Sequence, residues 1–390
     1  MNQTIVLIFL SLNIRFFKYF YNNCLLFSVS CVIIIDRALK EQHPVVIMKD
    51  TRIRLAVAGL GFGWHIVNEL RGPRGSADIE LAGICDPDPE RSAGCAAESG
   101  ARVYRDLDEI LADESVEAVG LYTPPHRRAE LIGAILRAGK AVMTTKPFED
   151  DPEAAAEVLE LARSRKLVLH LNSPGPEPAP DQRLIMEWRR EFGLGEPVSA
   201  FWETHACYHE KADGSWMDDP ARCPAAPLFR LGIYGINDLV ELCGEPVDCR
   251  IMQSRIATGR PTADNAMLGI SFANGALGCV AASFRVDDGK PYANRLLINY
   301  ERGTVWRALS RDPEGVCRLT LMGKGGGKER ILREAEIDTA EHSGAYQWGV
   351  FRRAIRERRS ISAEYARRIV SSIELVNSFT QQCLRSENAL

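Results

Sequence analysis

The sequence predicts an α/β protein. Its N-terminal part is expected to be a Rossmann domain with a doubly wound parallel sheet, and its C-terminal part an α+β domain with a large, mainly antiparallel open sheet. Between residues 53 and 172, short apolar runs alternate with amphipathic helical stretches, which is typical of a parallel sheet with helices on both faces. After residue 172 the alternation stops, and strand-like segments follow one another with turns between them, as in antiparallel sheets.

Composition excludes several classes of function. The 390 residues are 46% hydrophobic and 26% charged, and the net charge is −4. This balance gives no electrostatic case for binding nucleic acid or an anionic membrane. Eleven cysteines without a CxxC pair favour reduced thiols in a cytoplasmic enzyme over a disulfide framework.

One cluster of potential metal ligands, "THACYHE", contains His205, Cys207 and His209 at alternating positions. In a strand these side chains would share one face. A zinc site would need a fourth ligand, so we predict a sheet face or a subunit interface here, and no metal site.

Residues 1–47 differ from the rest of the chain because they are rich in Ile, Phe, Asn and Tyr. Three interpretations are open: a start codon assigned upstream of Met48, a signal or anchor segment, or a structured extension. We favour the first, because "MKDTRIRLAVAGLG" reads as a natural start before a strand. The expected domains are then 48–172 for the cofactor and 173–390 for substrate and oligomer contacts.

The first predicted strand, residues 53–59, is a continuous apolar run that leads into "GLGFGWH". Gly59 and Gly61 match the first two glycines of G-x-G-x-x-G, which permit a tight turn and a close approach of backbone amides to a pyrophosphate. With Phe62 and Gly63 they form the predicted cofactor turn. Because Trp64 holds the third glycine's position, close packing of helix on strand must be arranged differently here.

The second strand, residues 79–86, ends in Asp86. A carboxylate at this point accepts hydrogen bonds from the ribose hydroxyls and repels a 2′-phosphate, which favours NAD over NADP. The alternative is that Asp86 only caps the next helix, near residues 87–94.

Further strand and helix units follow at regular intervals. Residues 103–113 read as a short strand and a helix, and later strands are expected at 116–122, 141–145 and 167–172, with helices at 128–140 and 152–166. Ligands bind outside the carboxyl ends of such strands. Thr123, Pro124, Pro125, His126 and Lys146 are therefore expected to lie together at that edge.

The second domain begins after a proline-rich loop, residues 174–181. A helix is expected at 183–195, and two more end the chain at 345–359 and 363–384. The seven segments expected as strands are 197–206, 247–256, 265–273, 276–285, 294–301, 303–309 and 317–323.

The order of these motifs resembles the glucose–fructose oxidoreductase / inositol dehydrogenase / MocA family from about residue 48 to residue 383. The matching pieces are "AGLGFG", "TPPH", "TTKPF", "GLGEPV", "GSW", "LGIYGINDLVELCGEPV" and "ERGTVWRAL". The resemblance implies a dinucleotide-dependent oxidoreductase acting on sugars, cyclitols or related polyols. It also implies that the open sheet makes dimer or tetramer contacts.

Four residues at the expected active site depart from the family pattern. Thr145 precedes Lys146 where the family has Glu-Lys-Pro. In "RLGIYGIN", Arg230, Tyr234 and Asn237 replace the Asp, His and Asp of the family's box. A tyrosine at the histidine position resembles the subgroup in which tyrosine is the acid/base.

We therefore predict that Tyr234 and Lys146 are catalytic. A free tyrosine has a pKa of about 10, and a nearby ammonium stabilises the phenolate and lowers that pKa. Lys146 is also expected to contact the cofactor. The alternatives are a core aromatic at position 234 and a solvated loop charge at position 146. His126 is a second-choice proton donor or lines the nicotinamide pocket.

Arg230, Asn237 and Trp216 are the expected substrate contacts. Arg230 would bind an acidic sugar bidentately, or would only pair with Asp238 or Glu241. The predicted activity is hydride transfer between NAD (NADP is less favoured) and a secondary alcohol or ketone of a sugar, polyol or sugar acid. The alternative, kept open by the altered box, is a non-catalytic NAD-binding sensor. We expect a cytoplasmic homodimer or homotetramer, unless residues 1–47 form a signal or anchor.

Overall fold

The computed structural model describes residues 52–257, 259–289, 292–310, 316–325, 327–338 and 341–387. The three interpretations of residues 1–47 therefore concern a segment outside the described residues. The described chain belongs to one compact unit, Arg52–Leu390, so the division into domains at residue 172 stays a prediction.

Five parallel strands form the first sheet in the order β2-β1-β3-β4-β5, which confirms the predicted Rossmann arrangement. The strands are apolar because most of their residues are buried between helices on both faces. Their bounds are β1 Ile53–Ala58, β2 Ile79–Cys85, β3 Ala118–Leu121, β4 Ala141–Thr144 and β5 Leu169–Leu171. The short strand expected near residue 103 is a single bridge between Val103 and Ile84.

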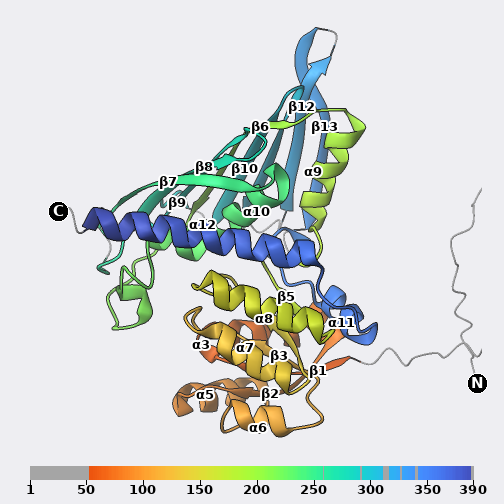
Figure 1. The fold of residues 1–390 in the computed structure, drawn as a ribbon, viewed down its shortest axis with the longest axis vertical. Coiled ribbons are helices and arrows are strands. Elements are labelled where there is room, and N and C mark those ends of the chain that lie inside the picture. The colour runs from red at the N-terminus through yellow and green to blue at the C-terminus, as the bar shows by residue number, and fades with distance from the viewer. Residues whose placement is uncertain are drawn as a thin grey trace, which may run out of the picture. The chain divides into compact units, whose positions relative to one another are not determined.

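Helices cover both faces of this sheet (Figure 1). Helices α7, α8 and α12 pack on one face, and α3 and α11 pack on the other. Asp88 and Asp151 accept backbone N–H bonds at the starts of α5 and α8, and a proline follows each, which fixes where these helices begin. The bounds are α3 Leu60–Arg71, α4 Pro73–Asp78, α5 Pro89–Ser99, α6 Leu107–Ala112, α7 Arg128–Arg137, α8 Pro152–Ser164, α11 Trp348–Arg356 and α12 Ala363–Glu387.

Eight strands form the second sheet in the order β13-β12-β11-β10-β6-β9-β8-β7. Only β6 and β9 are parallel neighbours among the described pairs, so the sheet is mainly antiparallel, as predicted. The bounds are β6 Pro197–His205, β7 Pro246–Ser254, β8 Asn265–Phe272, β9 Leu277–Ser283, β10 Ala293–Tyr300, β11 Gly303–Ser310, β12 Val316–Gly325 and β13 Lys328–Asp338.

The sequence interpretation missed strand β13. Its sequence, KERILREAEID, is rich in good helix formers and is mostly exposed, so neither propensity nor burial indicates a strand. Antiparallel pairing with β12 along its length decides its conformation.

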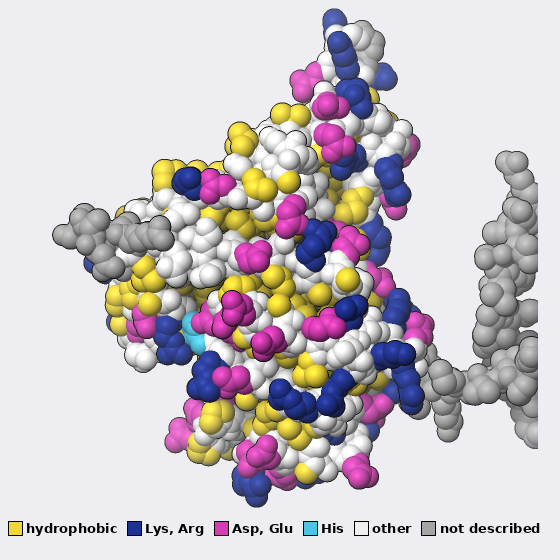
Figure 2. Space-filling model, viewed as in Figure 1, with side chains coloured by type: hydrophobic (Ala, Val, Ile, Leu, Met, Phe, Trp, Pro, Cys, Tyr) yellow, Lys and Arg dark blue, Asp and Glu magenta, His cyan; other side chains and the backbone are white. Residues whose placement is uncertain are grey.

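One face of the second sheet is covered and the other is open. Helices α9 (Pro180–Glu191), α10 (Ile233–Cys243) and α12 contribute to the core on the covered face, where Trp202 and Leu268 are buried. The open face carries exposed Phe201, Met252 and Trp306, and Figure 2 shows hydrophobic side chains at the surface along β7 and β8. Among the described residues, no helix combines the length and the apolar character needed to cross a membrane.

The glycine turn after β1 shows how helix α3 approaches the sheet. Gly59 has a left-handed φ of +89°, and a Cβ added there would lie 2.8 Å from the backbone carbon of Tyr122. A Cβ added to Gly63 would lie 2.9 Å from Val57 Cγ1. Gly63, one residue before the family's position, therefore allows the close helix–strand packing. Trp64 instead packs against α5, where its Nε1 donates to Glu98 at 2.9 Å.

We predict that Gly63→Ala lowers the free energy of unfolding by about 1–3 kcal/mol, because the added methyl group is forced against Val57. Gly61→Ala is the matched control: a Cβ there meets nothing within 4 Å, and we expect a change below about 1 kcal/mol. Urea unfolding measures both values. Equal effects of the two substitutions would contradict this account of the packing.

Candidate active site

Strands β1, β3, β4 and β5 end in register at one edge of the first sheet. Gly59, Thr123, Lys146 and Asn172 follow these strand ends. Thr123 and Lys146 were predicted from the sequence to lie at this edge, and Gly59 was predicted to begin the cofactor turn; the structure places all three there. Asn172 was not singled out.

The structure brings Lys146 and Tyr234 together. Lys146 Nζ lies 4.4 Å from the centre of the Tyr234 ring and donates a hydrogen bond to the backbone oxygen of Arg230. That oxygen belongs to a π-helical turn, Leu228–Gly232, which leads into α10. Such turns are frequent at functional sites. The amine therefore lies over the ring of Tyr234, in the position of a cation–π contact.

Lys146 is half-buried, and its surroundings disfavour its charged form. Removal of the amine from water, together with the positive charges of Arg230 and Arg128, lowers the pKa of Lys146 to about 7. The ammonium is consequently present below about pH 7, and the neutral amine predominates above it.

A buried arginine, Arg128, holds the loops that follow β3 and β4. Its guanidinium donates to the backbone oxygens of Thr123, Thr145, Pro147 and Phe148. Burial lowers the pKa of Arg128 to about 10. The sequence offered no signal for this role, because nothing in "TPPHRRAE" separates Arg128 from a surface arginine.

Asn172, at the end of β5, connects the two predicted catalytic residues. Its Oδ1 accepts from Thr145 Oγ1 at 3.2 Å and from the Lys146 N–H at 3.3 Å. Its Nδ2 donates to Tyr234 Oη at 3.2 Å and to the Gly344 oxygen at 2.9 Å. One side chain therefore touches both the Lys146 loop and the Tyr234 hydroxyl.

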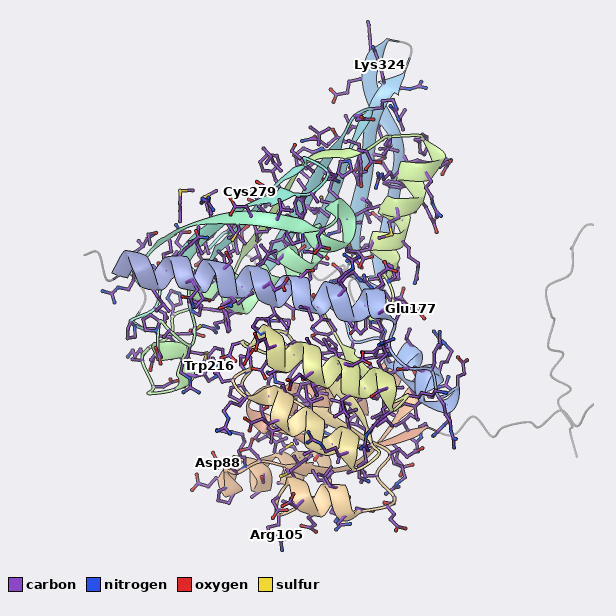
Figure 3. All side chains as sticks on the ribbon, in the orientation of Figure 1. Asp88, Arg105, Glu177, Trp216, Cys279 and Lys324 are labelled. Carbon is purple, nitrogen blue, oxygen red and sulfur yellow. The ribbon has the colours of Figure 1, made fainter. Side chains whose placement is uncertain are left out.

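His126, in the loop after β3 of the first sheet, lies close to Trp216, in the segment after β6 of the second sheet. His126 Nδ1 pairs with Asp150, and its ring centre lies 5.7 Å from that of Trp216. Trp216 is in a short 3₁₀ turn, Trp216–Asp218, of the segment between β6 and α10, and Figure 3 shows it where this segment approaches the helices that cover the first sheet.

The residues at this edge fit a bound dinucleotide. Thr123 Oγ1 and His126 Nε2 are buried and have no hydrogen-bond partner in the part of the chain that the structure describes. Gly61 leaves open space at the start of α3, where helix N–H groups favour phosphate. The Phe62 side chain is 42% exposed, which leaves an aromatic surface beside the same turn.

Asp86 has protein partners for both carboxylate oxygens. Its Oδ2 accepts from the Leu60 N–H at 2.6 Å, and its Oδ1 accepts from the Asp88 N–H at 2.9 Å and from Arg91 at 3.0 Å. The helix at 89–99 is capped by Asp88, not by Asp86. The carboxylate thus fixes the glycine turn against the end of β2.

Arg230 pairs with Glu210, and the pairing with Asp238 or Glu241 expected as an alternative is wrong. Both terminal nitrogens of Arg230 donate to the Glu210 carboxylate at 2.7 Å. Glu210 also accepts from Arg260 at 3.0 Å. Asp238 instead binds Arg307, and Glu241 pairs with Arg368.

Asn237 is buried one helical turn after Tyr234. Its Nδ2 donates to Ser173 Oγ at 2.8 Å, while its Oδ1 has no partner among the described residues. Asn237, Ser173 and Lys146 line the same cavity beside α12.

In the described ranges, no three His, Cys, Asp or Glu side chains are grouped so that they could hold a metal ion. In the "THACYHE" segment, Cys207 Sγ lies 3.4 Å from His209 Nε2. His205 ends strand β6.

Two models of known protein families match successive parts of the chain. The model of the "Oxidoreductase family, NAD-binding Rossmann fold" matches residues 53–173, and the "GFO/IDH/MocA C-terminal domain" matches residues 183–306. The chain thus has the fold of a dinucleotide-binding oxidoreductase. The two models together match more than half of it, and the chain belongs to the Gfo/Idh/MocA family.

Two curated relatives are named for dehydrogenase activities. The chain is 34% identical over 230 residues to inositol 2-dehydrogenase of Rubrobacter xylanophilus, which covers 54% of this chain and 63% of the relative. It is 28% identical over 235 residues to UDP-N-acetylglucosamine 3-dehydrogenase of Acidithiobacillus ferrooxidans, covering 59% and 67%. Among four curated relatives, the chain spans between 39% and 67% of their length.

A solved structure shares the whole fold. KijD10, a 3-ketoreductase from Actinomadura kijaniata in complex with NADP, superimposes with a TM-score of 0.63 and 19% identity over 84% of this chain and 96% of KijD10. This likeness supports the two-sheet architecture.

The charge around Lys146 can be tested directly. Arg230→Gln removes one positive neighbour and leaves Glu210 without its bidentate partner, and both changes favour the ammonium. We therefore expect the pKa of Lys146 to rise from about 7 by about one pH unit or more. The measurement is the pH dependence of Lys146 acylation, followed by mass spectrometry of its peptide.

Arg127→Gln is the control for this prediction. Arg127 precedes Arg128 in the sequence, but it is exposed and pairs with Glu130. Its loss should therefore leave the Lys146 titration unchanged. A parent Lys146 that titrates with ordinary surface lysines would contradict the assignment.

Proposed function

We propose that this protein is an NAD-dependent oxidoreductase that interconverts a secondary alcohol and a ketone of a sugar, a polyol or a sugar acid. The observation that carries the proposal is the contact between Lys146 and Tyr234, 4.4 Å from amine to ring centre, at the carboxyl edge of a dinucleotide-binding sheet. This edge is where parallel α/β sheets bind their ligands.

The proposed chemistry requires a group that accepts one proton. When an alcohol is oxidised, its O–H proton passes to the Tyr234 oxygen, while the C–H hydrogen leaves with two electrons as a hydride. A nicotinamide cofactor, when bound, supplies the acceptor for that hydride. In the reverse direction, Tyr234 donates the proton. Lys146 stabilises the ionised tyrosine when it is charged.

Cofactor residues are assigned to the same edge. Gly59, Gly61, Phe62 and Gly63 would hold the pyrophosphate turn, and Asp86 the adenosine ribose. Thr123, Pro124, His126 and Lys146 would line the nicotinamide side. The partnerless oxygen and nitrogen of Thr123 and His126 support this assignment, because buried polar atoms are normally satisfied.

Substrate contacts are proposed for Trp216 and Asn237. Trp216 lies beside His126, and Asn237 has a partnerless buried oxygen that can accept a bond from a hydroxyl group. Arg230 is less suited to an acidic substrate than its sequence position suggests, because Glu210 occupies both of its terminal nitrogens. Neutral sugars or cyclitols are therefore favoured, consistent with the name of the inositol 2-dehydrogenase among its relatives.

The open face of the second sheet is the proposed contact between subunits. Cross-strand neighbours Cys279, Phe201, Leu297 and Trp306 form one row on this face, and Phe201 and Trp306 are about half exposed. Aromatic residues on an open sheet are typical of homodimer contacts.

Removal of the proton-transfer pair should abolish turnover and spare cofactor binding. We expect Tyr234→Phe and Lys146→Met each to lower kcat/KM by about 10²–10⁴-fold, with NADH affinity, read by fluorescence, changed little for Tyr234→Phe. The assay is turnover of a panel of neutral and acidic sugars and cyclitols. Tyr104→Phe, which removes a hydroxyl bonded to Asp113, is the matched control. Full turnover in either catalytic variant would contradict the proposal.

Cofactor preference should depend on Asp86. Asp86→Ser removes the charge that repels a 2′-phosphate and releases Arg91, which is then able to bind that phosphate. The ratio of NADP to NAD affinity should rise by about tenfold or more, measured by titration of both cofactors. Asp151→Ser changes an aspartate that caps helix α8 and should leave the ratio unchanged. A parent protein that already prefers NADP would overturn the assignment of NAD.

A further inference from the structure

Asn172 lies between the Lys146 loop and the Tyr234 hydroxyl. Both the oxygen and the nitrogen of its side chain make two hydrogen bonds each. A carboxamide offers two donors and two acceptor sites, and Asn172 makes four contacts, to Thr145, Lys146, Tyr234 and Gly344. Only 2% of the residue is exposed, so water does not compete for these contacts.

The orientation of this amide follows from the chemistry of two backbone partners. The N–H of Lys146 can only donate, so the atom that faces it must be the Asn172 oxygen. The carbonyl of Gly344 can only accept, so the atom that faces it must be the nitrogen. The same nitrogen lies 3.2 Å from Tyr234 Oη. Asn172 therefore donates to the tyrosine oxygen, which must accept.

Tyr234 is held on other sides as well. A Cβ added to Gly344, whose φ is +98°, would lie 2.8 Å from Tyr234 Cε1, so the backbone of this segment packs directly on the ring edge. The neighbouring Ser343 is bonded to Asp181 and Asp238 in the core. The Tyr234 ring consequently has little freedom to leave the Asn172 amide.

We propose that Asn172 is a positioning residue for proton transfer: it donates a hydrogen bond to the Tyr234 oxygen and so stabilises the phenolate when the hydroxyl proton has moved to the substrate. Asn172 itself neither gains nor loses a proton. This inference rests on the proposed function of Tyr234. Asn172 adds to the stabilisation of the phenolate that Lys146 provides. The Lys146 amine lies over the ring and is only partly charged at neutral pH.

The test compares Asn172→Asp and Asn172→Ala with the parent. Aspartate has the same shape but presents a carboxylate oxygen to Tyr234 Oη, whereas alanine removes the donor. Donor loss disfavours the phenolate and a facing anion disfavours it more. The pKa of Tyr234 should therefore rise by about one pH unit or more in Asn172→Ala, and further in Asn172→Asp.

Two readouts are used on the full chain. Ultraviolet difference titration, with a Tyr234→Phe version of each protein subtracted, gives the ionisation of Tyr234 without any turnover. The pH profile of kcat/KM for alcohol oxidation should move in the same direction, with at least about a tenfold loss at pH 7. If Asn172→Asp does not fold, Asn172→Ala still carries the test.

Asn299→Asp is the control. Asn299 is a half-buried asparagine of β10 whose amide donates to Ser199 Oγ at 3.0 Å and whose oxygen accepts from Thr304 at 3.0 Å, so the same change is made in the second sheet. It should leave both the Tyr234 titration and the pH profile unchanged. An unchanged Tyr234 titration in both Asn172 variants would overturn the inference. A shifted titration without turnover in the parent would sustain the inference and refute the proposed dehydrogenase activity.

Discussion

The position of helix α10 depends on one buried ion network beside the second sheet. Arg307 of β11 donates to Asp181 and Asp238 at 2.8 Å each, and all three side chains are essentially inaccessible to water. Asp238 also accepts from Trp202 and Gln182. Removal of one partner of such a pair typically costs about 3–5 kcal/mol, because the other charge stays buried. Asp238 is one helical turn from Tyr234, so this network fixes the tyrosine relative to the sheet behind it.

The loops at the edge of the first sheet are held in place by a buried arginine. Parallel strands end in register, and the loops after them have no regular partners for their carbonyl groups, so Arg128 supplies the donors. Burial of a guanidinium is tolerable there because several oxygens surround it. Lys146 is thereby held next to Tyr234, and Asn172 joins the two halves. Each half of the candidate site is thus fixed by a buried arginine, Arg128 on one side and Arg307 on the other.

Much of this arrangement could be predicted from the sequence, because it follows from local pattern. Apolar runs and amphipathic helices predicted the parallel sheet, with one short strand near residue 103 that is only a bridge in the structure, and "TTKPF" and "LGIYGIND" pointed to Lys146 and Tyr234. The parts that could not be predicted depend on contacts between distant residues. Strand β13 forms only because β12 pairs with it, Arg230 turns to Glu210 twenty residues earlier, and Asn172 gains its role from Gly344, far along the chain. The sequence correctly indicated that helix–strand packing is arranged differently where Trp64 replaces the third glycine, but only the contact with Val57 identifies Gly63 as the residue that allows it.

The central claim is that Tyr234 exchanges a proton with the substrate while Lys146 and Asn172 hold it in place. A crystal structure of the ternary complex with NADH and a cyclitol or sugar that the enzyme turns over tests it most directly. We predict that the reacting hydroxyl group lies within hydrogen-bond distance of Tyr234 Oη, that Asn172 still donates to the same oxygen, and that the carbon faces the nicotinamide. A reacting hydroxyl group that faces His126 instead, with Tyr234 out of reach, would contradict the account.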